Sequence, residues 1–148
     1  MHALRVFVVP FTVAVTMSAS AQDFSTPEAA FREHQQAFAS RDVQRFLATI
    51  EFRQEAIEQL QRASKANSTP SEAAIAEVAA TREAELRGHL ENRGFRPATL
   101  DACEVIAKWQ DSDNQVRFPL TCKVPNGSNT FPVRLMRFPH GWRVVRGG

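Results

Sequence analysis

Two cysteines bracket one short segment in the C-terminal half of the chain, and their spacing strongly constrains its fold. Cys103 and Cys122 are the only cysteines among the 148 residues. The polar cluster at 111–114 is typical of a turn between two strands, and a symmetric hairpin about it places Cys103 directly opposite Cys122. Opposed Cβ atoms in antiparallel strands lie about 4.5–5.5 Å apart, which is close enough for a disulfide. We therefore predict that a Cys103–Cys122 disulfide ties this hairpin together; two free core thiols are the alternative.

The same register predicts one apolar face for the hairpin, because a slip of one residue would move every side chain to the opposite face. Pro119 conflicts with regular pairing. If the cysteines form a non-hydrogen-bonded pair, Pro119 falls at a hydrogen-bonded position, where proline has no N–H to donate. We therefore expect a bulge or irregular pairing near Pro119. The opposed apolar pairs in this register are Val105 and Leu120, Ala107 and Phe118, and Trp109 and Val116.

The N-terminus has the three parts of a secretory signal peptide. Arg5 is the only Lys or Arg before an apolar run at 6–15, and small residues follow up to Ala21. The run is shorter than the roughly 20 residues that span a bilayer, and no cysteine follows it to carry a lipid. We predict a signal peptide at 1–21, cleaved after Ala21, and one domain at 22–148 that has no membrane span. We expect a periplasmic or secreted location, where the disulfide can form.

The charge balance argues against nucleic acid as a partner. The chain has 18 Lys and Arg residues against 16 Asp and Glu, a formal net charge of +2, whereas phosphate binding needs a concentrated basic excess. The sequence also shows no glycine-rich phosphate loop, no nucleophile-elbow serine and no zinc-finger spacing. We therefore expect no nucleic-acid partner, no cofactor and no metal.

Apolar residues recur with helical spacing before Gly94 and alternate with polar residues, as in strands, after it. Thr26, Asp42 and Ser71 are candidate N-caps, a further helical segment covers 53–65, and Gly94 suits a helix C-terminus. Beyond it, Asn126-Gly127 is typical of a type I′ hairpin turn, which would place Phe131, Val133 and Leu135 on the apolar face of the sheet. We predict an α+β fold in which N-terminal helices pack on a four-stranded antiparallel meander sheet.

This order of elements and two local patterns resemble the nuclear transport factor two-like superfamily, whose cone-shaped α+β fold is also called cystatin-like. Residues 26–50, TPEAAFREHQQAFASRDVQRFLATI, are similar to the family's opening helix, its small-residue-Arg-Asp turn and its second helix. Residues 140–146, HGWRVVR, are similar to its last strand. The chain looks like the small exported members of unknown function. It departs from the family in the long helical section at 53–93, which leaves the shape of the cavity mouth open.

The resemblance implies a cavity between the sheet and the helices, which some relatives use for isomerisation or dehydration and many use for binding or dimerisation. Enzymatic relatives place an Asp, or an Asp with a His, in this cavity for proton transfer. Here His34 could carry a proton, but no carboxylate is evident to orient it, so we favour a histidine hydrogen-bonded in the core or at the rim and assign no catalytic residue. The candidates to line the cavity are His34, Phe38, Trp109 and Phe118.

Basic residues from different strands are expected on the outward sheet face. They could bind an acidic partner or an anionic envelope component, although a solvated sheet face gives the same pattern and is the interpretation we favour. These residues are Lys108, Arg117, Lys123, Arg134 and Arg143.

The sequence thus favours an exported, non-catalytic binding or interaction module. Its ligand would be a small apolar molecule in the cavity or an envelope protein against the sheet, and a homodimer is a further option. The alternatives are a small lyase or isomerase that uses His34 and a structural accessory of an envelope complex.

Overall fold

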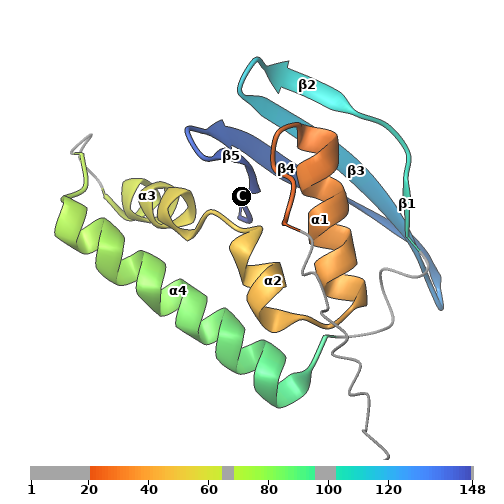
Figure 1. Ribbon diagram of the computed structural model, residues 1–148, viewed down its shortest axis with the longest axis horizontal. Coiled ribbons are helices and arrows are strands. Elements are labelled where there is room, and N and C mark those ends of the chain that lie inside the picture. The colour runs from red at the N-terminus through yellow and green to blue at the C-terminus, as the bar shows by residue number, and fades with distance from the viewer. Residues whose placement is uncertain (1–20, 65–68, 96–102, 148) are drawn as a thin grey trace, which may run out of the picture.

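Four helices precede an antiparallel sheet in the computed structural model, which describes residues 21–64, 69–95 and 103–147 (Figure 1). The predicted α+β class is confirmed. Of the predicted signal peptide only Ala21 is among the described residues, so export and cleavage stay predictions. The helices are α1 (Pro27–Ala39), α2 (Val43–Ala48), α3 (Phe52–Ala63) and α4 (Glu72–Arg93). The strands are β1 (Cys103–Val105), β2 (Trp109–Ser112), β3 (Gln115–Val124), β4 (Gly127–Phe138) and β5 (Gly141–Val144).

Local capping sets the helix boundaries. Thr26, Asp42 and Ser71 are confirmed as N-caps, because each side chain accepts a hydrogen bond from a backbone N–H in the first turn of α1, α2 and α4, respectively. Gly94 follows α4 with a φ of 69°, a left-handed conformation that glycine adopts without steric strain. The long helical section is therefore two separate helices, α3 and α4, which pack side by side (Figure 1). Among the described residues, no helix is both long and apolar enough to cross a membrane.

The sheet has the order β1-β3-β4-β5, and β2 also pairs with β3. α1 lies against this sheet, where the Phe31 ring stacks on that of Phe118 with the ring centroids 4.7 Å apart. Phe31 and Phe118 belong to the main core, which β3 supplies with four buried residues of one parity, from Val116 to Cys122. The cysteines are paired as predicted: Cys103 is opposite Cys122, the Cα atoms are 4.0 Å apart and the sulfurs form a disulfide.

The first predicted strand is interrupted between β1 and β2, so the sheet has five strands rather than four. Pro119 is the physical reason. Its carbonyl oxygen accepts a hydrogen bond from the Ile106 N–H at 3.1 Å, but proline has no N–H to return. The irregularity expected near Pro119 is confirmed, and it lies in the opposing strand. It shifts the register by one residue, so Trp109 lies opposite Arg117 and its predicted position opposite Val116 is wrong; the predicted pairing of Ala107 falls in the interruption.

The β3–β4 hairpin has the predicted faces with a different turn. Val124 pairs with Gly127, so Pro125 and Asn126 form the turn, and the positive φ falls at Gly127 rather than at Asn126. The predicted type I′ turn is therefore wrong, because proline cannot adopt a positive φ. The apolar face is confirmed, since Phe131, Val133 and Leu135 lie opposite Leu120, Phe118 and Val116, respectively.

The outer edge of β4 is only partly covered. β5 pairs with it from Leu135 to Phe138, and no described strand pairs with its edge at 131–134. Pro132 lies opposite Pro119. Because the Pro119 carbonyl points toward Ile106 and hence away from β4, the pair is non-hydrogen-bonded, and the Pro132 nitrogen points toward the open edge. Proline is tolerated at such an edge.

Candidate ligand-binding cavity

A cavity of about 520 Å³ lies along the open edge of β4, just beyond the point where β5 stops pairing. Four consecutive residues of β4, 131–134, line it. Successive side chains of a strand point to opposite faces of the sheet, so a cavity that contacts all four reaches around the edge of the strand to both faces. The lining residues are His34 of α1, Gln115 and Arg117 of β3, residues 131–134 of β4 and residues 144–147 at the C-terminal end.

The C-terminal wall of the cavity is held by an ion pair between a buried carboxylate and a partly exposed arginine. Glu55 of α3 is 2% exposed, and its carboxylate accepts hydrogen bonds from the backbone N–H of Arg146 at 2.8 Å and from the Arg146 Nε and Nη2 at 3.0 Å each. A second cation, the Nη1 of Arg82 in α4, lies 3.6 Å from the same carboxylate. The Val145 N–H also donates to the Arg134 carbonyl at 2.9 Å. These bonds fix the segment after β5 against β4 and α3, so the cavity is formed without a ligand.

The connection between α2 and α3 supports the same region. Residues 49–51 run parallel to β5, with the Val144 N–H donating to the Thr49 carbonyl at 2.8 Å and the Glu51 N–H donating to the Val144 carbonyl at 2.9 Å. The Thr49 side chain is fully buried below His34 of α1. The outer edge of β5 is therefore covered, whereas that of β4 at 131–133 is open, since the Arg134 carbonyl accepts the Val145 N–H.

His34 is partly buried, and its hydrogen bond defines its tautomer. Its Nδ1 lies 2.6 Å from the Thr49 Oγ1, and that hydroxyl donates its one proton to the Phe46 carbonyl at 2.6 Å. The Thr49 oxygen must therefore accept from His34 Nδ1–H, which leaves the lone pair on Nε2. This nitrogen makes no hydrogen bond to the described residues, and none of their buried side-chain nitrogens lacks a partner, so Nε2 is accessible.

The surroundings of His34 keep its ring neutral. Burial, together with the nearby positive charge of Arg146, lowers the pKa of His34 from 6.5 to about 4. The ring also stacks on Phe46, with the centroids 4.6 Å apart. At neutral pH His34 thus presents a hydrogen-bond acceptor, not a cation, to the cavity.

Three arginines contribute the charged part of the lining, and each is held by a carboxylate. The Arg117 Nε and Nη2 donate to both oxygens of Asp111 at 2.7 and 2.6 Å, and the Arg134 Nη2 donates to Glu58 at 2.6 Å. The third is Arg146, on Glu55. None of the three carboxylates lines the cavity. Hydrogen bonds from Arg117 lower the pKa of Asp111, which therefore stays ionised at neutral pH.

The other predicted cavity residues lie elsewhere. Phe38 packs edge-on against Phe46 and Phe95, and Phe118 lies in the core under α1. Trp109 is on the surface, with the Arg117 guanidinium 5.3 Å above its ring centroid. Among the four predicted lining residues, the structure places His34 in the cavity wall and the other three outside it.

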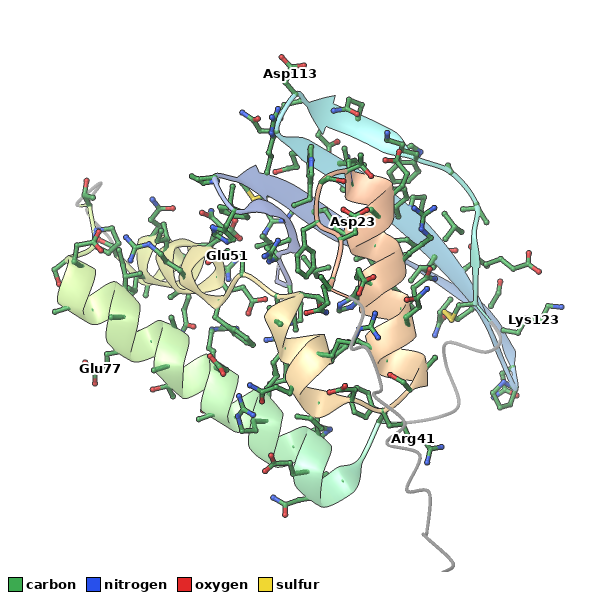
Figure 2. The ribbon with its side chains drawn as sticks, viewed as in Figure 1. Asp23, Arg41, Glu51, Glu77, Asp113 and Lys123 are labelled. Atoms are coloured by element: carbon green, nitrogen blue, oxygen red, sulfur yellow. A yellow bond between two sulfur atoms is a disulfide. The ribbon has the colours of Figure 1, made fainter. Side chains whose placement is uncertain are left out.

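Of the five predicted basic residues, the register places Arg117, Lys123, Arg134 and Arg143 on one face of the sheet, whereas Lys108 lies outside the described strands. Lys108 pairs with Glu28 of α1 at 2.5 Å, and the Arg143 guanidinium lies 3.5 Å from the ring centroid of Phe24. Arg117 and Arg134 belong to the cavity. Lys123 is exposed near the tip of the β3–β4 hairpin, at the opposite end of the sheet from Asp113 (Figure 2).

Several residues that line the cavity were not predicted from the sequence. Gln115, Phe131 and Val133 are recognisable as strand residues, but their position in a cavity depends on where β5 ends. Arg146 follows the last strand, and no local pattern indicates that it binds Glu55, which is 91 residues away along the chain. Within the described ranges no three His, Cys, Asp or Glu side chains lie close enough together to hold a metal ion.

Comparison with known proteins gives one distant structural similarity. No family model matches the chain, and no curated protein matches it. A crystal structure described as an NTF2-like transpeptidase from Campylobacter jejuni is similar at a TM-score of 0.46 and 14% sequence identity, over 83% of this chain and 100% of the other. That description names the superfamily that the sequence resembles. At this distance the similarity carries no argument about function, which we base on the cavity itself.

Proposed function

We propose that the protein is a binding module that holds a small organic ligand in the cavity at the β4 edge. The cavity itself carries this proposal: its volume of about 520 Å³ is in the usual range for small-molecule sites, about 300–1,000 Å³. Its lining combines apolar side chains such as Phe131 and Val133 with a few fixed polar groups, the composition typical of such sites. The ion pair of Glu55 with Arg146 supports a preformed site, because it fixes one wall.

The environment of His34 favours binding over catalysis. The ring is oriented by the Thr49 hydroxyl, and no carboxylate among the described residues hydrogen-bonds to it. A histidine that works as a general base is most effective with a pKa near the working pH, whereas the pKa of His34 is lowered to about 4. His34 therefore presents a hydrogen-bond acceptor to the cavity and is poorly suited to act as a general base.

A lyase or isomerase remains the second candidate, because the accessible lone pair on His34 Nε2 is the group that such an enzyme would use as its base. The two functions differ in the response to His34→Gln, once a ligand is known. A binding module loses part of its affinity, whereas an enzyme loses turnover while it still binds its substrate.

Native mass spectrometry tests the binding function directly. The protein is purified from an oxidising compartment without detergent and compared with Val133→Trp, in which the larger side chain fills the cavity. We expect extra mass on the wild type that Val133→Trp lacks. The matched control is Val105→Trp, at an exposed position outside the cavity, which should keep the extra mass. Equal ligand loads in all three proteins would contradict the proposal.

We also propose an exported location. The disulfide supports it, because disulfides persist in the periplasm and outside the cell and are rare in the cytosol. Cell fractionation of the full-length protein, with mass analysis of its N-terminus, tests both this location and cleavage after Ala21. Recovery of an uncleaved chain in the cytosol would contradict both.

A further inference from the structure

We propose that the ligand of the cavity is an organic anion, whose carboxylate or similar head group binds Arg117, Arg134 and Arg146 while its apolar body lies against Phe131 and Val133. This inference rests on the proposed binding function and names the chemical class of the ligand.

Backbone pairing brings the three arginines together. Arg117 of β3 and Arg134 of β4 are directly opposed in the ladder, so their side chains leave the same face of the sheet. The Arg134 carbonyl accepts the N–H of Val145, the residue before Arg146. Three segments of the chain thus bring one guanidinium each to the same cavity. A carboxylate outside the cavity balances each of these charges, so the convergence of guanidinium N–H donors, rather than a net positive charge, favours an occupant with anionic oxygen atoms.

Each guanidinium retains donors for a ligand. An arginine side chain has five N–H donors in a planar fork. Arg117 and Arg146 use Nε and Nη2 for their carboxylates, and Arg134 uses Nη2. The Nη1 groups of all three donate no hydrogen bond to the described residues. Two N–H donors therefore remain on each Nη1.

The carboxylate partners hold the arginine side chains in position without occupying the cavity. Asp111, Glu58 and Glu55 contact the guanidiniums but do not line the cavity. They limit the rotation of side chains that would otherwise lose much conformational freedom on binding. Fixed, charged donors form the stronger class of hydrogen bonds with carboxylates and phosphates.

His34 adds an independent readout of the charge of the ligand. Burial is the larger cause of the lowered pKa of His34, and the positive charge of Arg146 is the smaller one. Any ligand adds burial, which lowers the pKa of His34, but an anion bound between His34 and Arg146 also offsets the charge of Arg146. The pKa of His34 should therefore be higher with an anion than with a neutral ligand of the same shape. The groups that face the ring are Thr49 and Phe46 from the α2 end and Arg146 from the C-terminal segment.

Three probes with one apolar body test the inference: 4-phenylbutyrate, 4-phenylbutanol and 4-phenylbutylamine. Each is titrated by NMR into the protein with its disulfide intact, and the pKa of His34 is followed with and without the probe. We expect 4-phenylbutyrate to shift the signals of the cavity residues, to bind about tenfold more tightly than the alcohol and to give His34 a higher pKa than the alcohol does.

A pair of surface variants provides the control. Arg117→Gln removes one cavity guanidinium without leaving a buried charge unpaired, because Asp111 is exposed, and it should weaken 4-phenylbutyrate several-fold. Arg137→Gln removes an exposed arginine of the same sheet outside the cavity and should leave the affinity unchanged. Equal losses in both variants would show a general charge effect and overturn the inference.

The remaining outcomes distinguish a failure of the anionic ligand class from a failure of the binding function. If the alcohol or the amine binds in the cavity as tightly as the carboxylate, the anionic class is wrong while the binding function stands. If no probe shifts the cavity residues, the inference is overturned; if the native protein also carries no ligand mass, the binding function fails as well.

Discussion

The two edges of the β3–β4 hairpin differ in how they are covered. The β3 edge is covered by β1 and β2, and a disulfide ties β1 to it. The β4 edge is covered by β5 only as far as Leu135, and the cavity begins where this pairing stops. Each edge carries one proline, Pro119 or Pro132. The candidate site is thus formed where a strand ends early, because a longer β5 would pass along the edge that the cavity occupies.

The largest expected effect comes from the wall beside the open edge. Glu55→Ala removes the buried acceptor of three hydrogen bonds from Arg146, one of them from its backbone N–H. Because hydrogen bonds to a charged group contribute about 1.5–3 kcal/mol each, we expect a loss of about 3–5 kcal/mol. Urea unfolding followed by circular dichroism measures the loss. Glu77→Ala, on the outward side of α4 (Figure 2), is the control and should change stability by no more than about 0.5 kcal/mol. Similar stabilities of the two variants would contradict a role for Glu55 in this wall.

Removal of the disulfide at the covered edge should lower the free energy of unfolding by less than Glu55→Ala does. Cys103 and Cys122 are 19 residues apart, and a disulfide that closes a loop of about this size contributes roughly 2–4 kcal/mol. Unfolding of the oxidised protein is compared with that of the Cys103→Ser, Cys122→Ser double variant. Alkylation of the oxidised wild type before reduction checks the pairing, and labelling of both cysteines would contradict it.

Mild acid should lower the stability of the protein, because His34, beside the open edge, is held neutral in the folded state. Its pKa is about 4 when folded against 6.5 ordinarily, so the unfolded chain takes up the proton first as the pH falls. The stability is fully present above pH 6.5, falls by about 1–2 kcal/mol by pH 5 and declines further toward pH 4. Thermal unfolding at pH 7.5 and pH 5 measures this loss. His34→Gln should remove most of the difference, since the carboxylates titrate alike in both proteins; an unchanged difference would exclude His34 as its source.

The smallest effect is expected at the interruption between β1 and β2. Lys108 joins this segment to Glu28 of α1 through an exposed ion pair, and such pairs are worth about 0–1 kcal/mol. Lys108→Ala should therefore leave unfolding nearly unchanged, and any loss should diminish in high salt. A loss as large as that from removing the disulfide would show that the ion pair, not the cysteines, holds this edge.

The features of the covered edge could be predicted from local sequence patterns, whereas the cavity at the open edge could not. The hairpin register, the cysteine pair and the conflict at Pro119 follow from neighbours in the sequence, as do the helix caps. The one-residue shift that moves Trp109 to the other face follows from how the chain relieved that conflict, which the alternation of residues does not specify. The cavity depends on contacts between distant segments, above all Glu55 with Arg146, for which no periodic pattern exists.

Pro132 has a consequence for solubility. An exposed strand edge can recruit an identical edge from a second molecule and begin a growing sheet. At Pro132 the open edge lacks the N–H that such pairing requires, and its partner across the ladder, Pro119, lacks one as well. Pro132 thus protects the open edge of β4 from pairing with a second molecule. Replacing Pro132 with valine should increase aggregation even if the fold is unchanged.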